Sequence, residues 1–353
     1  MAMATRNWSR SLFSSLNNAN EVVHSAIKTT IPFQGSVRYV RTLVPNSKPP
    51  TQKDVNLLSE FFDRSKNLVV LTGAGISTEC GIPDYRSPGG AYNTGYKPMI
   101  HQEFMGSSRV RSRYWAKHYE SWKKFSEAKP GPAHTALATL EKANRISFMM
   151  TQNIDRLHHQ AGSKPLELHG TMHDVTCVKC DLSISRKKFQ DQVNSLNPTW
   201  AKAIESLATR KNSDDSLGLK KSPNGDIEID ENFWESKLQI PSCSRCNGIL
   251  KPKVVFFGDN IPKHIITRSI KAAEECDAFL VLGSSLTVVH PFQLLRDAHD
   301  AGAATAIVNI GKTEADRFVD LKIDAQVGKI LQRVIEEICV PATQEYDQDE
   351  ICK

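Results

Sequence analysis

Short runs of apolar residues recur along the chain, with longer amphipathic stretches between them. The runs occupy residues 67–72, 146–151, 166–169, 253–257, 278–283 and 305–310. The first amphipathic stretch begins at Thr51, which can cap a helix together with Asp54. Nearly continuous apolar strands that alternate with helices are typical of a parallel sheet with helices on both faces. The pattern predicts an α/β fold with a Rossmann-like parallel sheet, in which ligands bind at the carboxyl ends of the strands.

The positive charge of the chain is concentrated at its start. The 353 residues carry a formal charge of +6, with 40% hydrophobic and 24% charged residues. Residues 1–50 hold six basic side chains and one acidic one, so the rest of the chain is close to neutral. A nearly neutral body argues against a nucleic-acid partner, because phosphate binding needs a concentrated basic face.

The basic leader, residues 1–48, is rich in Ser and Arg and ends at a proline-marked stretch. This composition is typical of an organellar transit peptide, although a plain disordered tail remains an alternative. Arg38 and Arg41 near a cleavage point favour the mitochondrial matrix, with the plastid as the alternative. The sequence has no apolar run of the roughly 18 residues needed to span a bilayer. We expect a soluble protein without a membrane span, and a monomer.

Four of the eight cysteines form two C-x-x-C pairs, which can supply four thiolates to one tetrahedral zinc ion. Because four thiolates leave no open position, the metal is expected to be structural. Two disulfides or redox pairs are the alternative, which a reducing matrix disfavours. Residues 181–242 separate the pairs, and 211–230 are polar without a clear period, which indicates a long inserted loop. The predicted ligands are Cys177, Cys180, Cys243 and Cys246.

The expected organisation is therefore a Rossmann-like domain interrupted by a small zinc-ribbon-type module. Its predicted segments are a leader at 1–48, the first part of the Rossmann-like domain at 51–170, the zinc module at 171–250, the second part of the Rossmann-like domain at 251–338, and an acidic tail at 339–353.

The first apolar run leads into the glycine turn Thr-Gly-Ala-Gly-Ile-Ser at 72–77, a form that brings backbone N–H groups close to phosphate. The turn departs from the usual dinucleotide fingerprint, because Thr78 stands where a third glycine is expected. No acidic residue occupies the usual ribose-binding place either. A standard dehydrogenase is thereby disfavoured.

The continuation of this turn carries a specific resemblance. The sequence reads GAGISTECGIPDYRS at 73–87, TQNID at 151–155, LHG at 168–170, KPKVVFFGD at 251–259, GSSL at 283–286 and NIG at 309–311. Together with the cysteine pairs, these motifs resemble the sirtuin family over about 54–338. RYW at 113–115, PTW at 198–200 and Tyr85 are most similar to the class II branch, which includes mitochondrial members.

The resemblance implies an NAD-dependent protein lysine deacylase whose substrates are acylated lysine side chains. It also implies a set of binding residues. The predicted NAD contacts are Gly73, Ala74, Gly75, Ile76 and Ser77 at the pyrophosphate, Asp84, Tyr85 and Arg86 on a closing loop, Gln152, Asn153, Ile154 and Asp155 at the ribose and nicotinamide, and Gly283, Ser284, Ser285, Asn309, Ile310, Gly311 and Val327 at the adenosine. The predicted substrate-binding residues are Val254, Val255, Phe256, Phe257 and Gly258, which would pair with the substrate backbone.

His169 is the predicted general base, with Asn153 and Asp155 as the other catalytic residues. His169 falls at the end of an apolar run, where its ring can face bound ligand, and neutral imidazole is a competent base near matrix pH. In the implied reaction the acyl oxygen attacks the nicotinamide ribose, and His169 relays a proton from a ribose hydroxyl. The products would be free lysine, nicotinamide and O-acyl-ADP-ribose.

Several alternatives remain open on the sequence alone. The same pocket could serve a mono-ADP-ribosyltransferase, and a non-catalytic NAD-binding module is a third possibility. His169 could be a hydrogen-bonded structural residue, and Asp155 could cap the helix that follows it. For His134 and His158 a packing or capping role is favoured. The aromatic residues Tyr114, Trp115, Tyr119, Trp122 and Phe125 have the helical spacing of a core face. The preferred acyl group is not evident.

Overall fold

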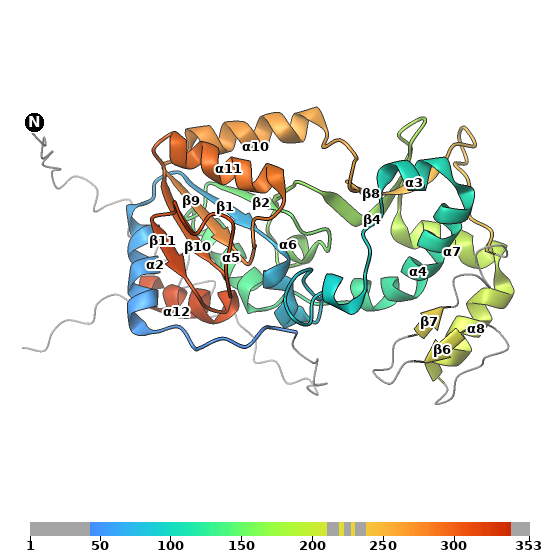
Figure 1. Cartoon of the computed structure of the whole chain (residues 1–353), viewed down its shortest axis with the longest axis horizontal. Helices are drawn as coiled ribbons and strands as arrows, with labels where there is room; N and C mark the ends of the chain where they lie inside the picture. The colour runs from blue at the N-terminus through green and yellow to red at the C-terminus, as the bar shows by residue number, and fades with distance from the viewer. Residues whose placement is uncertain (1–42, 210–218, 222–226, 230–237, 340–353) are drawn as a thin grey trace, which may run out of the picture.

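The computed structural model describes residues 43–209, 219–221, 227–229 and 238–339, which form a larger and a smaller lobe (Figure 1). The expected leader and acidic tail lie almost wholly outside these residues. Most of the expected loop at 211–230 also lies outside them, although two short paired strands occur within it. These strands are β6 (Leu219–Lys221) and β7 (Ile227–Ile229).

The larger lobe is built on a six-stranded sheet in which all paired strands are parallel, in the order β11-β10-β9-β1-β2-β3. The chain builds outward from β1 to β3, then returns to the other side of β1 with β9. The switch point therefore lies beside β1, and the predicted Rossmann-like fold is confirmed. The strands are β1 (Leu68–Thr72), β2 (Phe148–Thr151), β3 (Leu166–Glu167), β9 (Ala278–Leu282), β10 (Ala304–Val308) and β11 (Leu321–Ile323).

Helices cover both faces of this sheet, and each face has its own apolar core (Figure 1). The expected cap at Thr51 is present as a capping box with Asp54. Helices α2 (Gln52–Arg64), α5 (Pro132–Lys142) and α12 (Val327–Cys339) pack on one face. Helices α10 (Lys263–Glu275) and α11 (Val289–Asp300) pack on the other. Three short helical segments lie in the connections between strands. The segments η1 (Ala74–Cys80) and η2 (Tyr92–Thr94) lie between β1 and β2, and α6 (Leu157–Gln160) lies between β2 and β3.

The smaller lobe contains a three-stranded antiparallel sheet in the order β5-β4-β8. The run at 253–257 was expected in the parallel sheet, and this was wrong, because residues up to Val254 belong to β8 here. Lys253 at the start of the run is exposed and Val254 and Val255 are only partly buried, so the run does not have two buried faces. The elements of this lobe are β4 (Gly170–Cys177), β5 (Ser183–Ser185), β8 (Leu250–Val254), α3 (His101–Gly106), α4 (Ser108–Glu127), α7 (Arg186–Leu196) and α8 (Pro198–Thr209).

Helices α3 and α4 share the core of the smaller lobe, although they lie between β1 and β2 in the sequence. Tyr114 and Trp115 are buried there, Tyr114 against Phe256 and Trp115 against Phe189, so the predicted core face of the aromatic stretch is confirmed for these residues. The smaller lobe is thus made from two separate parts of the chain, a feature that the predicted boundaries at 171 and 250 did not include.

Candidate functional site

The loops after β1 and β9 touch each other at the switch point of the sheet. The backbone N–H of Gly73 donates to the Leu282 carbonyl at 3.0 Å, and that of Gly75 donates to the Gly283 carbonyl at 2.8 Å. A Cβ atom at Gly73 would lie 2.7 Å from the carbonyl oxygen of Gly283. The close approach of these two loops therefore explains why glycine stands at the start of the turn.

The loop after β2 joins this arrangement through its side chains. The Asn153 amide donates to the Gly73 carbonyl at 3.0 Å and to the Ser77 hydroxyl at 3.1 Å. Ser77 in turn donates to the Asp155 carboxylate at 2.7 Å, and Gln152 donates to Ser284 at 2.8 Å. Asn153 and Asp155 are buried. The structure thus brings together predicted residues from the loops that follow β1, β2 and β9.

Asp155 also has the local role that was considered as an alternative. Its Oδ1 accepts the backbone N–H of Leu157 at 2.9 Å, which stabilises the start of α6, while Oδ2 accepts from Ser77. The carboxylate is therefore fixed in place by two donors.

His169 lies between β3 and β4, where the chain passes from the larger to the smaller lobe. Its Nδ1 lies 3.1 Å from the carbonyl oxygen of Gln152, and since a carbonyl can only accept, Nδ1 carries the proton. Nε2 of the neutral ring is then the nitrogen with a free lone pair. Burial lowers the pKa of His169 below 6.5, although the hydrogen bond to Gln152 opposes this. The ring is therefore neutral at neutral pH, as a general base requires.

The predicted substrate segment leaves β8 beside His169. The N–H of Val255 donates to the His169 carbonyl at 3.0 Å, and Phe257 forms a parallel bridge with Ile100. The Phe257 side chain is 50% exposed, which is unusual for phenylalanine and leaves an apolar surface available. Gly170, which directly follows His169, has φ +73°. A Cβ atom there would lie 2.1 Å from the Lys253 carbonyl oxygen, so only glycine lets β8 approach this closely.

The residues predicted for the adenosine half also gather at this edge. Asn309 and Gly311 follow β10, and Gly283 donates from its backbone to the Val308 carbonyl at 2.9 Å. Ser285 contacts Thr287 through its hydroxyl, and Val327 begins α12. The loop with Asp84, Tyr85 and Arg86 is held by its own contacts, since Asp84 accepts from the Ser87 N–H at 3.0 Å and Arg86 lies over the Tyr92 ring.

Some contacts behind the site had no recognisable signal in the sequence. Thr72 and Thr151 close β1 and β2 with a buried hydroxyl pair at 2.8 Å, and His158 contacts Thr72 at 2.8 Å. His134 packs against His158 with ring centroids 4.9 Å apart. Both histidines are buried, in agreement with the packing role favoured for them. Their contacts depend on the meeting of separate elements, which spacing along the chain does not reveal.

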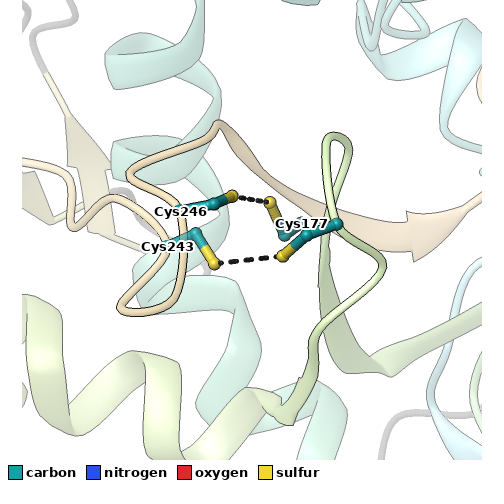
Figure 2. Close-up of side chains that lie close together, drawn as sticks. Cys177, Cys243 and Cys246 are labelled. Carbon is teal, nitrogen blue, oxygen red and sulfur yellow. Dashed lines mark hydrogen bonds between the residues drawn. The ribbon is translucent and has the colours of Figure 1, made fainter.

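The four predicted cysteines come together between β4 and β8 (Figure 2). Their sulfur atoms all lie within 4.8 Å of one another, with Cys177 and Cys246 at 3.5 Å and Cys180 and Cys243 at 3.7 Å. Four sulfurs at about 2.3 Å from one zinc ion would be separated by about 3.8 Å, so the cluster fits the metal. The two knuckles match, because Asp181 and Asn247, each following the second cysteine, are both left-handed at φ 56°.

A parallel sheet in Rossmann order, a neutral histidine that follows its edge strand β3, and a four-cysteine module together define a nucleotide-binding α/β protein with a structural metal centre. The Sir2 family model matches residues 73–291, and the chain belongs to the Sir2 family.

Relatives of this chain are named as NAD-dependent enzymes. The chain is 58% identical to "NAD-dependent protein deacylase SRT2" of Arabidopsis thaliana, over 86% of this chain and 82% of the relative. It is 40% identical to "NAD-dependent protein lipoamidase sirtuin-4, mitochondrial" of Homo sapiens, over 82% and 88%. A solved structure of Sir2 with a p53 peptide and NAD+ matches with a TM-score of 0.58 and 29% identity, over 80% of this chain and 98% of that one.

Proposed function

We propose that this chain is an NAD-dependent protein deacylase that removes acyl groups from lysine side chains, with His169 as the general base. The observation that carries the proposal is the contact between the carbonyl of Gln152 and Nδ1 of His169. This contact leaves Nε2 as the basic atom at the point where the loops of the sheet meet the 254–258 segment. The names of the relatives support the same activity.

The NAD co-substrate would supply a ribose carbon that bears nicotinamide as its leaving group. The pyrophosphate of NAD would be held by the turn after β1, which comprises Gly73, Ala74, Gly75, Ile76 and Ser77. Asn153 and Asp155, already fixed by Ser77, would hold the nicotinamide carboxamide. Nε2 of His169 would accept a proton from a ribose hydroxyl and release it when the product leaves.

The substrate peptide would add as a strand beside residues 254–258. These residues extend from β8, an edge strand of the three-stranded sheet, so their backbone is placed for strand addition. The exposed Phe257 ring would contact the peptide. A solved Sir2 structure bound to an acetylated peptide supports this class of ligand.

The direct experiment is to incubate the protein with NAD and a panel of acyl-lysine peptides and to follow the mass of each peptide. The panel includes acetyl, longer aliphatic, branched and lipoyl chains, because the human and bovine relatives are named lipoamidases. We expect loss of the acyl mass with release of one nicotinamide per acyl group. Gain of ADP-ribose mass on a protein target, without deacylation, would instead establish the transferase.

We also propose that the protein works in the mitochondrial matrix. Two relatives are named as mitochondrial, and residues 1–50 have the charge expected of a targeting leader. Expression of the full chain fused at its C-terminus to a fluorescent protein tests the address. Import into plastids, or a diffuse signal that does not depend on residues 1–48, would contradict it. In the part of the chain that the structure describes, no helix is long and apolar enough to cross a bilayer.

A further inference from the structure

Arg156 adopts a backbone conformation that is unusual for its residue type. It has φ 58° and ψ 19°, in the left-handed region that long side chains rarely occupy. It directly follows Asp155, one of the residues proposed for the nicotinamide site. Left-handed residues other than glycine persist only where the surroundings hold them, and they gather at functional sites.

The surroundings that hold Arg156 come from both lobes. Its Nη2 donates to the Asp174 carboxylate on β4 at 2.7 Å, and its Nε lies 3.5 Å from the Glu167 carboxylate on β3. The Arg156 side chain is 33% exposed, and those of Asp174 and Glu167 are 22% and 19% exposed. The two ion pairs are therefore partly shielded from solvent, and they contribute more than pairs on an open surface.

These ion pairs end a continuous series of contacts between the loop after β2 and the strand that follows His169. His169 contacts the Gln152 carbonyl, the Met172 N–H donates to the Ile154 carbonyl at 3.0 Å, and the His173 ring donates to the Asp155 carbonyl at 2.9 Å. Arg156 and Asp174 are the next pair in this series. Four of the five residues at 152–156 are thus matched with a residue in the segment that begins at the proposed base, and Asn153 instead contacts the loop after β1.

We infer that Arg156 is a positioning residue, which fixes the nicotinamide loop to the strand after His169 through its left-handed backbone and its ion pairs to Asp174 and Glu167. The inference rests on the proposed roles of Asn153, Asp155 and His169. Arg156 need not touch NAD; it acts by keeping Asp155 and the Gln152 carbonyl in register with the ring of His169.

The test is a set of variants at one position, measured for the KM of NAD, the KM of an acyl-lysine peptide and inhibition by nicotinamide. In R156A the ion pairs are lost, and alanine also disfavours the left-handed backbone conformation at this position. In R156G the ion pairs are lost, but the left-handed conformation costs little. R156K keeps the charge beside Asp174. R64A removes an exposed ion pair on α2 and serves as the control.

We expect R156A to raise the KM of NAD and the half-inhibitory concentration of nicotinamide by roughly 2- to 5-fold, the size of a partly shielded ion pair. The KM of the peptide should stay at the wild-type value. R156G should show a smaller increase than R156A, R156K should fall near wild type, and R64A should match wild type. D174N should raise the KM of NAD similarly. R156A/D174N should have a KM of NAD no higher than that of R156A alone, because both substitutions remove the same ion pair.

An unchanged KM of NAD in R156A would overturn the inference. So would an equal rise of both KM values together with a lower Tm, which is the behaviour of a merely structural residue. The proposed function is tested separately by His169→Ala in the same assay. If that variant is inactive while the Arg156 series is flat, only the inference about Arg156 fails. If it turns over normally, the proposed role of His169 fails, and a wild-type protein that removes no acyl group would refute the proposed function itself.

Discussion

The proposed catalysis depends on the protonation of one residue, His169. Burial lowers its pKa below 6.5, so the ring is neutral and able to accept a proton throughout the neutral range. We therefore predict that kcat/KM is flat at and above pH 6.5 and falls only at lower pH, as the pH approaches the lowered pKa of His169. A pH profile between 5 and 8 checks this. A rate that rises on acidification would show that the neutral ring is not the required form.

Gly73 gives a second prediction at this scale, because its environment leaves no space for a side chain. A Cβ atom would meet the Gly283 carbonyl and the Ser284 Cβ at 2.7 Å. We expect Gly73→Ala to destabilise the fold by about 1–3 kcal/mol through overpacking and to raise the KM of NAD. Gly106→Ala is the matched control, since nothing lies within 4 Å of its added Cβ. Denaturant unfolding compares the free energies of unfolding of the two variants. Equal values for Gly73→Ala and Gly106→Ala would show that the loops after β1 and β9 are not tightly packed at Gly73.

At the scale of elements, the two cysteine knuckles connect β4 to β8 and so close the smaller lobe. Cys177 and Cys243 are part of its apolar core, so a bound metal stabilises that core directly. We predict that Cys177→Ser loses one zinc per chain and lowers the Tm, as measured by metal analysis and thermal unfolding. Cys276→Ser, at a buried cysteine whose sulfur contacts the Ala273 carbonyl, should keep its zinc. A stable, active Cys177→Ser protein without metal would refute the structural zinc.

The elements that the sequence predicted well are those with a strong local pattern. The buried strands from β1 to β3 and β9 to β10 have apolar runs, and the cysteine pairs have a diagnostic spacing. β11 was missed because it is short and contains Lys322. β8 was assigned to the wrong sheet because periodicity identifies a strand but not its partner. The contact of His173 with the Asp155 carbonyl and the positive φ of Arg156 arise from tertiary packing, so no local pattern could predict them.

At the scale of the whole molecule, the proposed active site lies where the chain passes between the lobes (Figure 1). The chain crosses from β3 to β4 at His169 and returns from β8 to α10 just after the proposed substrate segment. The sheet thereby presents the proposed NAD-binding loops, and the smaller lobe presents the proposed peptide-binding segment. The helices α3 and α4 join the smaller lobe from a distant part of the sequence, which the order of motifs could not indicate.

The buried histidine pair makes the whole fold sensitive to acid. Burial lowers the pKa of His134 to about 4 and that of His158 well below 6.5, so both are neutral in the folded protein. Unfolding lets them bind protons below pH 6.5, so stability is full above that pH and falls toward pH 4. Protonation of His134 in the unfolded chain alone should lower the free energy of unfolding by roughly 2 kcal/mol at pH 5.

Thermal unfolding between pH 7.5 and 5 measures this loss of stability. The His134→Gln variant, whose side chain can still accept from the Gly131 N–H, should lose less stability on acidification than wild type. His264→Gln, at an exposed position on α10, is the matched control and should follow wild type. An identical pH dependence in all three proteins would show that the buried pair is not responsible.

We propose the His169 ring as the base for deacylation, and removal of the ring tests this role. The measurement is the amount of deacylated peptide and nicotinamide formed by His169→Ala with NAD and the best acyl-lysine peptide, beside wild type and His264→Ala. We predict that His169→Ala keeps its zinc and its Tm but forms product at least about 100-fold more slowly, the usual contribution of a general base. Product formation by this variant at the wild-type rate would show that His169 is not the base.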